Sequence, residues 1–309
     1  MSQILPYNSI GEFYRGRFGA RVQKIPVSIA TDCPNRLGLK GMKTCVFCDE
    51  WGSSAYPERR AEELRDQLAN TIKDRAARYG ATKFIAYFQA YTSTFLAISK
   101  LRESFETALA FPEVHGIIIG TRPDCLSPTL LKFLNEYAQK TYLSVELGIQ
   151  TLNDADLTFM RRGHTAAQSL EAIRKIAAEA PELDLGVHLM FGNPNETREE
   201  LVETARRLSE LKLGHVKLHN LHVLKNTPLA QMYSAGEFAP IELEEYTERV
   251  ILFLRHLASH VRVHRLAAVA SRWDELVAPE WTRHKMKISQ HIIDTMNKRG
   301  VRQGQDALQ

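Results

Sequence analysis

Residues 33–48 read Cys33-Pro34-Asn35-Arg36-Leu37-Gly38-Leu39-Lys40-Gly41-Met42-Lys43-Thr44-Cys45-Val46-Phe47-Cys48, and they hold three of the chain's four cysteines. This C-x11-C-x2-C segment follows a short apolar stretch that we predict to be the first strand. A closed structural zinc site takes four ligands, and no fourth cysteine is nearby to complete one. Cysteine thiolates also hold iron–sulfur clusters, and three of them leave one iron open for another ligand.

Two other uses of these cysteines have to be weighed. A Cys-x-x-Cys pair is often half of a zinc site that His or Asp completes, and this alternative stays open on the cysteines alone. A disulfide framework is disfavoured, because the N-terminus has no basic and apolar secretory signal. Four cysteines in 309 residues are also too few for a disulfide-dense protein. We therefore expect a cytoplasmic protein with reduced thiols.

The composition is that of a globular protein. The chain is 44% hydrophobic and 25% charged, and its 309 residues can bury a large core. A net charge of +4 permits an anionic partner without requiring one. No apolar run approaches the ~18 residues that span a bilayer, so no membrane association is expected.

Strand and helix patterns alternate along the first 225 residues. The short, apolar, often β-branched segments typical of buried parallel strands are 25–30, 83–88, 114–119, 141–147, 184–191 and 214–219. The predicted helices between them are 57–79, 93–110, 128–139, 166–178 and 196–211. Gly80 marks the end of the first of these, and residues 195–198 supply an N-cap signal for the last.

These units predict an α/β fold, a partial (β/α)6 TIM-like barrel with a helical C-terminal extension. Residues 1–225 form the barrel, and residues 226–309 form a mostly helical extension packed on it. The extension has helical patterns at 241–259 and 279–299 and a short strand pattern at 261–264. No Gly-, Ser- or Pro-rich linker separates the two parts.

Polar or glycine-rich sequence follows each predicted strand, which is where a barrel of this kind places its active site. The first strand leads into the cysteine loop, and the others lead into segments 89–93, 120–125, 146–151, 192–196 and 219–222. Six such loops in succession predict one shared polar cavity.

Several of these segments together resemble the radical SAM superfamily, and more closely its YhcC/YtqA-type subfamily, whose core is related to the elongator catalytic subunit. The similarity runs from about residue 12 to about residue 300. The segments that carry it are Cys45-x-x-Cys48, Ala86-Tyr87-Phe88-Gln89-Ala90-Tyr91-Thr92, Ile119-Gly120-Thr121-Arg122-Pro123-Asp124-Cys125, Val145-Glu146-Leu147-Gly148-Ile149-Gln150-Thr151, Arg162-Gly163-His164, Leu221-His222-Val223-Leu224-Lys225, Val263-His264-Arg265-Leu266 and Leu276-Val277-Ala278-Pro279-Glu280-Trp281.

The resemblance implies a 4Fe–4S cluster on Cys33, Cys45 and Cys48, with S-adenosylmethionine bound to the open iron. It implies reductive cleavage of S-adenosylmethionine to a 5′-deoxyadenosyl radical, which abstracts hydrogen from a substrate. The cofactors carry this chemistry, and the protein supplies orientation and electrostatics. The electron would come from an external donor of flavodoxin or ferredoxin type. Cys125 is left over, so no second cluster is expected.

Five further residues are implied as S-adenosylmethionine contacts. Gln89 and Thr92 occupy the position that meets the amine of S-adenosylmethionine, and Arg122 could pair with its carboxylate. A buried structural pair between Arg122 and Asp124 is the alternative. Glu146 and Gln150 lie where ribose hydroxyls or the amine could bind. Substrate contacts are expected among His188, His219 and His222, with buried core histidines as the alternative.

The substrate cannot be read from the sequence. RNA, and tRNA in particular, is the favoured substrate hypothesis. The proteins that the chain resembles most closely in its core act on tRNA, and two regions of the chain are basic. These are Arg161-Arg162-Gly163-His164 and the tail segments 283–287 and 298–299, whose alternative is a solvated helix face. A different class of function, a non-enzymatic zinc-stabilised RNA-binding adaptor, also stays open.

Overall fold

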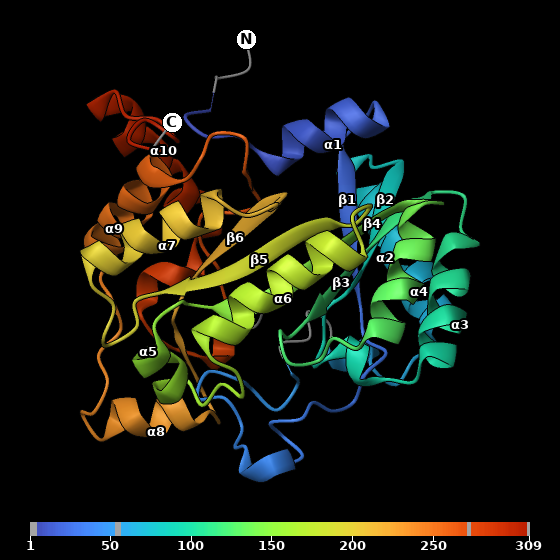
Figure 1. Cartoon of the computed structure of the whole chain (residues 1–309), viewed down its shortest axis with the longest axis horizontal. Coiled ribbons are helices and arrows are strands. Elements are labelled where there is room, and N and C mark those ends of the chain that lie inside the picture. The colour runs from blue at the N-terminus through green and yellow to red at the C-terminus, as the bar shows by residue number, and fades with distance from the viewer. Residues whose placement is uncertain (1–4, 53–56, 271–272, 308–309) are drawn as a thin grey trace.

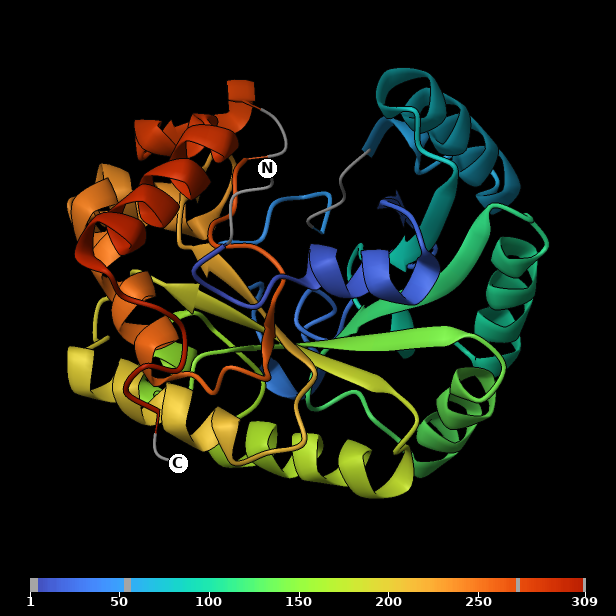
Figure 2. The ribbon, with the colours of Figure 1, turned by 90° about the horizontal axis from the view of Figure 1, so that it is seen from above.

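A seven-stranded parallel sheet curves through the protein, as a computed structural model shows for residues 5–52, 57–270 and 273–307. Its strand order is β1-β2-β3-β4-β5-β6-β8, so strands that follow one another in the sequence are also neighbours in the sheet. Helices cover the outer, convex side, and the sheet stays open between β1 and β8 (Figures 1 and 2). This is a half-barrel of the α/β class, as predicted.

The strands of the sheet begin and end close to their predicted positions. They are β1 (Val22–Val27), β2 (Lys83–Phe88), β3 (Val114–Thr121), β4 (Tyr142–Gln150), β5 (Asp184–Phe191), β6 (His215–Asn220) and β8 (Arg262–Val263). A separate antiparallel pair is formed by β7 (Val223–Leu224) and β9 (Leu276–Ala278).

The helices follow the strands in alternation. They are α1 (Ile10–Phe18), α2 (Leu64–Tyr79), α3 (Ile98–Leu109), α4 (Pro128–Ala138), α5 (Asp154–Phe159), α6 (Ala166–Glu179), α7 (Arg198–Ser209), α8 (Pro228–Ser234), α9 (Leu243–His256) and α10 (Lys285–Arg299). Gly80 ends α2 in the left-handed conformation that glycine adopts without strain, as expected. Thr197, inside the predicted N-cap segment, caps α7 in a capping box with Glu200.

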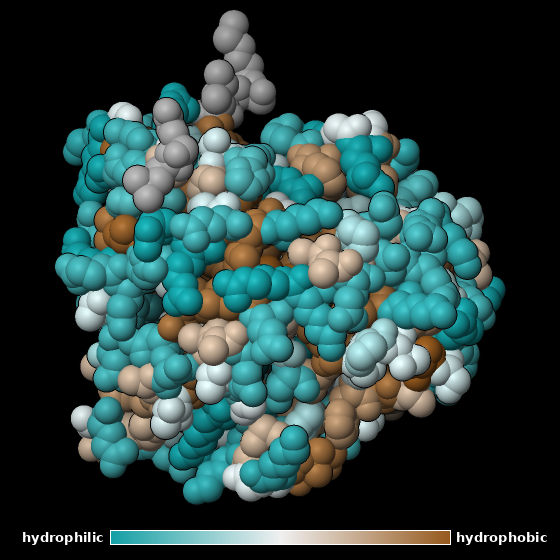
Figure 3. All heavy atoms as spheres, viewed as in Figure 1, coloured by the Kyte–Doolittle hydropathy of each residue, from teal (hydrophilic) through white to brown (hydrophobic). Residues whose placement is uncertain are grey.

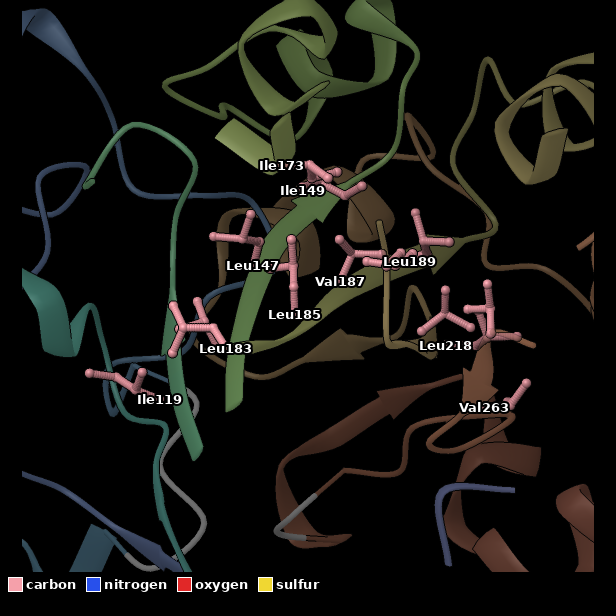
Figure 4. Close-up of a cluster of buried hydrophobic side chains, with 14 of the residues drawn as sticks. Ile119, Leu147, Ile149, Ile173, Leu183, Leu185, Val187, Leu189, Leu218 and Val263 are labelled. Atoms are coloured by element: carbon pink, nitrogen blue, oxygen red, sulfur yellow. The ribbon is translucent and has the colours of Figure 1, made fainter. Parts of the chain in front are cut away.

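Each strand of the sheet divides its side chains between two faces. On β4, Leu143, Val145 and Leu147 point to the helices and belong to the main apolar core, which continues through Leu185, Val187, Leu218 and Val263 (Figure 4). The alternate residues face the concave side, as the period of two of a strand requires. On β4 these include Ser144 and Glu146, which are fully buried although polar.

Helix α1 lies across one end of the concave side (Figure 2). Its Ile10 and Tyr14 pack against Ile85, Ile118 and Tyr142 of the sheet. The sequence pattern did not predict this helix, which is held by a Ser9 N-cap and ends at Gly19 in the left-handed conformation. It closes the amino end of the half-barrel, so the interior opens at the carboxyl ends of the strands.

The predicted strand count of six was one too low for the sheet. The short strand pattern at 261–264 is β8, which pairs in parallel with β6 through His215–Arg262 and Val216–Val263. The C-terminal extension therefore contributes a strand to the half-barrel as well as helices α9 and α10. The division of the chain at residue 225 remains a prediction.

The first described residues also meet this last strand. The backbone N–H of Val263 donates to the carbonyl of Asn8 at 2.6 Å, and Ser9 forms a bridge with Val263. Gln303 reinforces the contact, because its backbone N–H donates to the carbonyl of Pro6 at 2.9 Å. Segments from the two ends of the chain thus cover the open edge of β8.

Hydrophilic residues cover most of the surface seen in Figure 3, with apolar residues between them. Within the described residues, no helix has the combination of length and apolarity that crossing a membrane requires.

Candidate active site

A cavity of about 240 Å³ lies at the carboxyl ends of the strands. All the residues predicted to bind the cluster or S-adenosylmethionine line it, although they come from four separate parts of the sequence: Cys33, Cys45, Cys48, Gln89, Thr92, Arg122, Glu146 and Gln150. His188, His219 and His222 line it too. The shared polar cavity expected from the loop sequences is therefore present.

The cysteine loop follows β1 and is held by backbone and side-chain contacts. The Asn35 amide donates to the carbonyl of Lys43 at 2.8 Å and to the carbonyl of Arg161 at 2.6 Å. The backbone N–H of Cys48 donates to the carbonyl of Cys45 at 3.1 Å, so the Cys-x-x-Cys segment is a turn. Asn35 is 1% exposed, so these two hydrogen bonds satisfy a buried amide and tie the loop to the segment after α5.

The thiols themselves are enclosed. Cys33 and Cys45 are buried and Cys48 is partly buried. Burial, together with the nearby Cys45 and Asp49, raises the pKa of the Cys48 thiol to about 12. Arg162 supplies a counter-charge, because its Nη1 lies 3.3 Å from Cys45 Sγ while its Nη2 donates to the carbonyl of Gly148 at 2.8 Å.

Arg122, at the end of β3, is already paired. Its Nε and Nη2 donate to the two carboxylate oxygens of Asp124 at 2.9 and 2.7 Å, and Nη1 donates to Asn35 Oδ1. The buried pair with Asp124 that the sequence offered as an alternative is thus present. The Arg122 side chain still lines the cavity and contacts Met42 of the cysteine loop.

Glu146, on β4, is fully buried at the centre of a hydrogen-bonded group. Its carboxylate accepts from the Tyr87 hydroxyl at 2.7 Å, from Lys217 Nζ at 2.8 Å and from His188 Nε2 at 2.6 Å. Lys24 Nζ lies 3.4 Å from the other oxygen. We call these five residues the Glu146 group.

Charge and burial oppose each other in this group. Burial alone would raise the pKa of Glu146, but Lys217 and Lys24, followed by His188, hold it well below its usual range. Burial lowers the pKa of Lys217 to about 7 even though Glu146 opposes the shift. Burial and the Lys217 charge lower the pKa of His188 to about 3, so this imidazole is neutral and donates its Nε2 proton to the carboxylate.

Two more basic side chains stand beside this group. Arg265 follows β8, and its Nη2 lies 2.7 Å from His219 Nε2 at the end of β6. Burial and the Arg265 charge together hold the pKa of His219 well below its usual range, so His219 is neutral and accepts. Burial also lowers the pKa of His222, to about 4.

One sequence hypothesis about basic residues is corrected, and the spare cysteine is located. Arg162 and His164 were expected to meet phosphates at a surface, but Arg162 faces Cys45 and His164 is 4% exposed. Burial and the Arg162 charge lower the pKa of His164 to about 3. Cys125 is absent from the cavity lining within the described residues, and burial raises the pKa of its thiol to about 11.

Four residues in or next to the cavity were not identified as site residues from the sequence: Tyr87, Lys217, Arg162 and Arg265. Three of them line the cavity, and Lys217 contacts Tyr87 and Glu146. A signal for the first two was available, because they fall at concave-facing positions of strands whose other face is apolar. Reading the strands as uniformly apolar concealed it. Arg162 and Arg265 lie in loops, where no periodicity identifies an inward side chain.

The chain belongs to the radical SAM superfamily: the family model for that superfamily matches residues 27–208, and the model for the Radical_SAM C-terminal domain matches residues 214–298. It is 32% identical over 299 residues to YtqA of Bacillus subtilis (strain 168), covering 96% of this chain and 92% of that protein. It is 34% identical over 297 residues to YhcC of Escherichia coli (strain K12), covering 95% and 93%. The predicted family is therefore confirmed.

More distant relatives share parts of the chain or its fold. The tRNA-2-methylthio-N(6)-dimethylallyladenosine synthase of Roseiflexus sp. (strain RS-1) is 31% identical over 239 residues, which are 75% of this chain and 48% of that protein. The structure of the archaeal Methanocaldococcus infernus Elp3 with an N-terminal deletion (1–46) superposes with a TM-score of 0.68 at 18% identity, covering 91% of this chain and 64% of that one. The latter shows a shared fold.

Membership in this superfamily makes the chain a radical SAM enzyme. Enzymes of the superfamily generally bind a 4Fe–4S cluster and S-adenosylmethionine and take electrons from an external reductant.

Proposed function

We propose that the cavity holds a 4Fe–4S cluster on Cys33, Cys45 and Cys48 and S-adenosylmethionine beside it. When bound, these cofactors supply one-electron chemistry, in which reductive cleavage of S-adenosylmethionine yields a 5′-deoxyadenosyl radical that takes hydrogen from a substrate. One observation carries the proposal: the three cysteines of one loop and the five S-adenosylmethionine candidates from β2, β3 and β4 line the same cavity.

The donor set fits a cluster. Within the described part of the chain, no three His, Cys, Asp or Glu side chains are grouped as ligands of one metal ion. A cluster asks for a wider arrangement, because each thiolate binds a different iron. Burial raises the pKa of the Cys48 thiol, so its ionisation would accompany binding of the cluster.

The candidates for S-adenosylmethionine come from different strands and take different parts of the ligand. We propose that Gln89 and Thr92 meet its amine, that Arg122 pairs with its carboxylate, and that Glu146 and Gln150 bind near its ribose. Arg122 would share its guanidinium between the ligand and Asp124. Glu146 would act while keeping its bonds to Tyr87, Lys217 and His188.

The Glu146 group can hold and orient protons at the inner end of the cavity. The Tyr87 hydroxyl donates to Glu146 and accepts from Lys217 Nζ at 2.6 Å, so its hydrogen points to the carboxylate. Lys217, with a pKa of about 7, is close to balance between its two protonation states at neutral pH. These side chains therefore fix the polarity of the space in which a substrate would sit.

The electron donor and the substrate are further parts of the proposal. A donor of flavodoxin or ferredoxin type fits the exposed face of the cysteine loop, where Leu37 and Leu39 are 48% and 42% exposed beside Lys40. RNA, tRNA in particular, is supported by relatives that modify tRNA, such as the Roseiflexus synthase. In the basic tail, Arg283 pairs with Glu280 and Arg299 pairs with Glu248, as expected of a solvated helix face. The reduced thiols that such a cluster needs favour a cytoplasmic location.

Metal analysis of anaerobically purified protein tests the proposal. Four irons and four sulfides per chain are expected, with the broad absorbance of a 4Fe–4S cluster, and 5′-deoxyadenosine should form under strong reductant. Changing Cys33, Cys45 or Cys48 to Ala should remove iron and product, whereas the matched Cys125→Ala should keep both. Zinc without iron and sulfide would instead support the zinc-stabilised adaptor, and loss of iron in Cys125→Ala would overturn the ligand assignment.

A further inference from the structure

We propose that Arg265 and His219 form a subsite for an anionic group, a carboxylate or a phosphate, carried by the substrate. The inference rests on the proposed function, because it assigns the substrate end of the same cavity. It depends on how the charges of the cavity are compensated, on where Arg265 lies in the fold, and on which strand ends the cofactors use.

Arg265 differs from the other two arginines that line the cavity. Arg122 makes a bidentate pair with Asp124, and Arg162 contacts the Cys45 sulfur. Arg265 contacts only neutral groups in the described residues: Nε donates to the carbonyl of Leu218 at 3.3 Å, and Nη2 meets the His219 ring. Because no carboxylate lies within ion-pair distance, its remaining guanidinium donors are available to an anion entering the cavity.

The surroundings of Arg265 add to this shortage of negative charge. Three basic side chains, Lys24, Lys217 and Arg265, influence a single carboxylate, Glu146. Asp184 is paired with Arg262 at 2.5 Å. Two further carboxylates line the cavity, those of Asp49 and Glu275, and Arg265 makes an ion pair with neither within the described residues. A second negative group would therefore be attracted electrostatically, and in a water-poor site the attraction is stronger than at the surface.

Arg265 is half-buried, and partial removal from water makes an uncompensated guanidinium costly. Desolvation lowers the pKa of Arg265, with Tyr87 and Glu146 only partly opposing the shift. Retaining an arginine at such a position without a protein carboxylate is explained if a ligand supplies the missing charge. The planar guanidinium matches carboxylate and phosphate oxygens in two parallel hydrogen bonds.

The position of Arg265 separates this subsite from the cofactors. The cysteine loop follows β1, and the candidates for S-adenosylmethionine follow β2, β3 and β4. His219 ends β6 and Arg265 follows β8, at the opposite edge of the sheet. The anion expected here is therefore the substrate's, and the carboxylate of S-adenosylmethionine has its own candidate in Arg122.

The test measures binding of inorganic phosphate, and in parallel of acetate, to reconstituted protein saturated with S-adenosylmethionine. Calorimetry at constant ionic strength should detect binding of at least one of the two anions. Arg265→Gln should weaken it about tenfold or more, because a charge-assisted bidentate contact is lost. The matched control Arg206→Gln removes the same charge from an exposed ion pair and should leave binding unchanged.

Four results would overturn the inference. The first is that neither anion binds, and the second is that Arg265→Gln binds the anion as tightly as the wild type. The third is that Arg206→Gln weakens anion binding as much as Arg265→Gln does, and the fourth is that Arg265→Gln loses affinity for S-adenosylmethionine while phosphate competes for that site. The last would show that Arg265 holds the cofactor's carboxylate. If Arg265→Gln does not fold, Arg265→Lys serves, since it keeps the charge, loses the planar fork and should still bind the anion at least about threefold more weakly; equal affinity would overturn the inference.

The same samples separate this inference from the proposed function. Iron, sulfide and S-adenosylmethionine binding are measured on them first. A preparation without a cluster contradicts the proposed function, whereas a loaded preparation that fails to distinguish Arg265→Gln from the wild type contradicts only the anion subsite.

Discussion

Arg162 Nη1 lies 3.3 Å from Cys45 Sγ, and the same guanidinium donates to the carbonyl of Gly148 at 2.8 Å. One side chain thus joins the cysteine loop to the end of β4. The contact places a positive charge against the sulfur of a proposed cluster ligand.

Changing Arg162 to Met should weaken cluster retention. A hydrogen bond to a charged group contributes about 1.5–3 kcal/mol, so iron loss to a chelator should be about tenfold faster or more. The matched control is Arg161→Met, because the Arg161 side chain is exposed. Equal rates of iron loss in the two variants would remove Arg162 from the cluster environment.

Glu146 and Lys217 should be strongly coupled in stability. Glu146→Gln leaves two buried ammonium groups without their carboxylate and should lower the free energy of unfolding by about 3–5 kcal/mol. The double variant Glu146→Gln/Lys217→Met should lose less than the sum of the two single losses, which chemical denaturation measures. Glu248→Gln, which breaks a partly exposed pair with Arg299, should cost only about 0–1 kcal/mol. Additive losses at Glu146 and Lys217 would contradict a direct pair.

Arg122→Ala should weaken binding of S-adenosylmethionine about ten- to a hundredfold, because a bidentate contact with its carboxylate would be lost. Asp124→Asn is the informative partner variant, since it keeps the guanidinium and removes its protein counter-charge. Its affinity for S-adenosylmethionine should be equal or higher. Unchanged affinity in Arg122→Ala would leave Arg122 with a purely structural role.

We expect the free energy of unfolding to fall as the pH rises through the titration of the Glu196 carboxyl. Burial raises its pKa to about 7 although Arg249 opposes the shift, and the side chain is 4% exposed. The folded state therefore binds more protons than the unfolded state between pH 4.5 and about 7, and its stability falls across this range by on the order of 1–3 kcal/mol. Thermal denaturation of Glu196→Gln should lack this slope, whereas the exposed Glu199→Gln should retain it. A variant that keeps the wild-type slope would contradict the assignment.

Gly186 on β5 leaves space for the His215 ring. A Cβ atom at this position would overlap the imidazole, which is fully buried between Asp184 and Glu146. Gly186→Ala should therefore lower the free energy of unfolding by about 1–3 kcal/mol. Gly16→Ala, in α1 with nothing close to the added atom, should instead be neutral or stabilise by up to about 1 kcal/mol. Urea denaturation distinguishes them, and stabilisation by Gly186→Ala would show that the ring has room to move.

The fold followed from the sequence because its strands are apolar enough to be recognised. The helix starts were less clear, since the helices predicted from residues 57 and 279 begin at Leu64 and Lys285. All six predicted barrel strands overlap the observed ones within three residues at each end, and β2 and β5 agree at both ends. Helix α1 was not predicted because it is short and precedes the first strand, so it is not part of the strand–helix alternation. Strand β8 was recognised as a strand pattern, but its partner could not be known, since pairing depends on contacts far apart in the chain.

The candidate site was predictable where chemistry and position coincide. Three cysteines on one loop indicate a metal or cluster site by their spacing alone. Polar residues at the strand ends must lie close together because parallel strands end at the same edge of the sheet. Arg265 could not be assigned in this way, because its direction depends on the loop after β8. The pairing of Arg122 with Asp124 was only one of two options, since spacing does not show which partner a buried guanidinium takes.

The pairing of β8 with β6 and with the segment at Asn8 has a consequence for how the protein is made. The ribosome delivers residues 1–225, with every cysteine of the loop, before the strand and the arginine that complete the cavity. At ~5–20 residues per second, the stretch from residue 226 to Arg265 takes roughly 2–8 s to synthesise. During that interval the edge of β6 is uncovered and the cavity lacks a wall. Cofactor loading is therefore expected after release of the finished polypeptide, and a nascent chain stalled near residue 225 should expose its cysteines to alkylation.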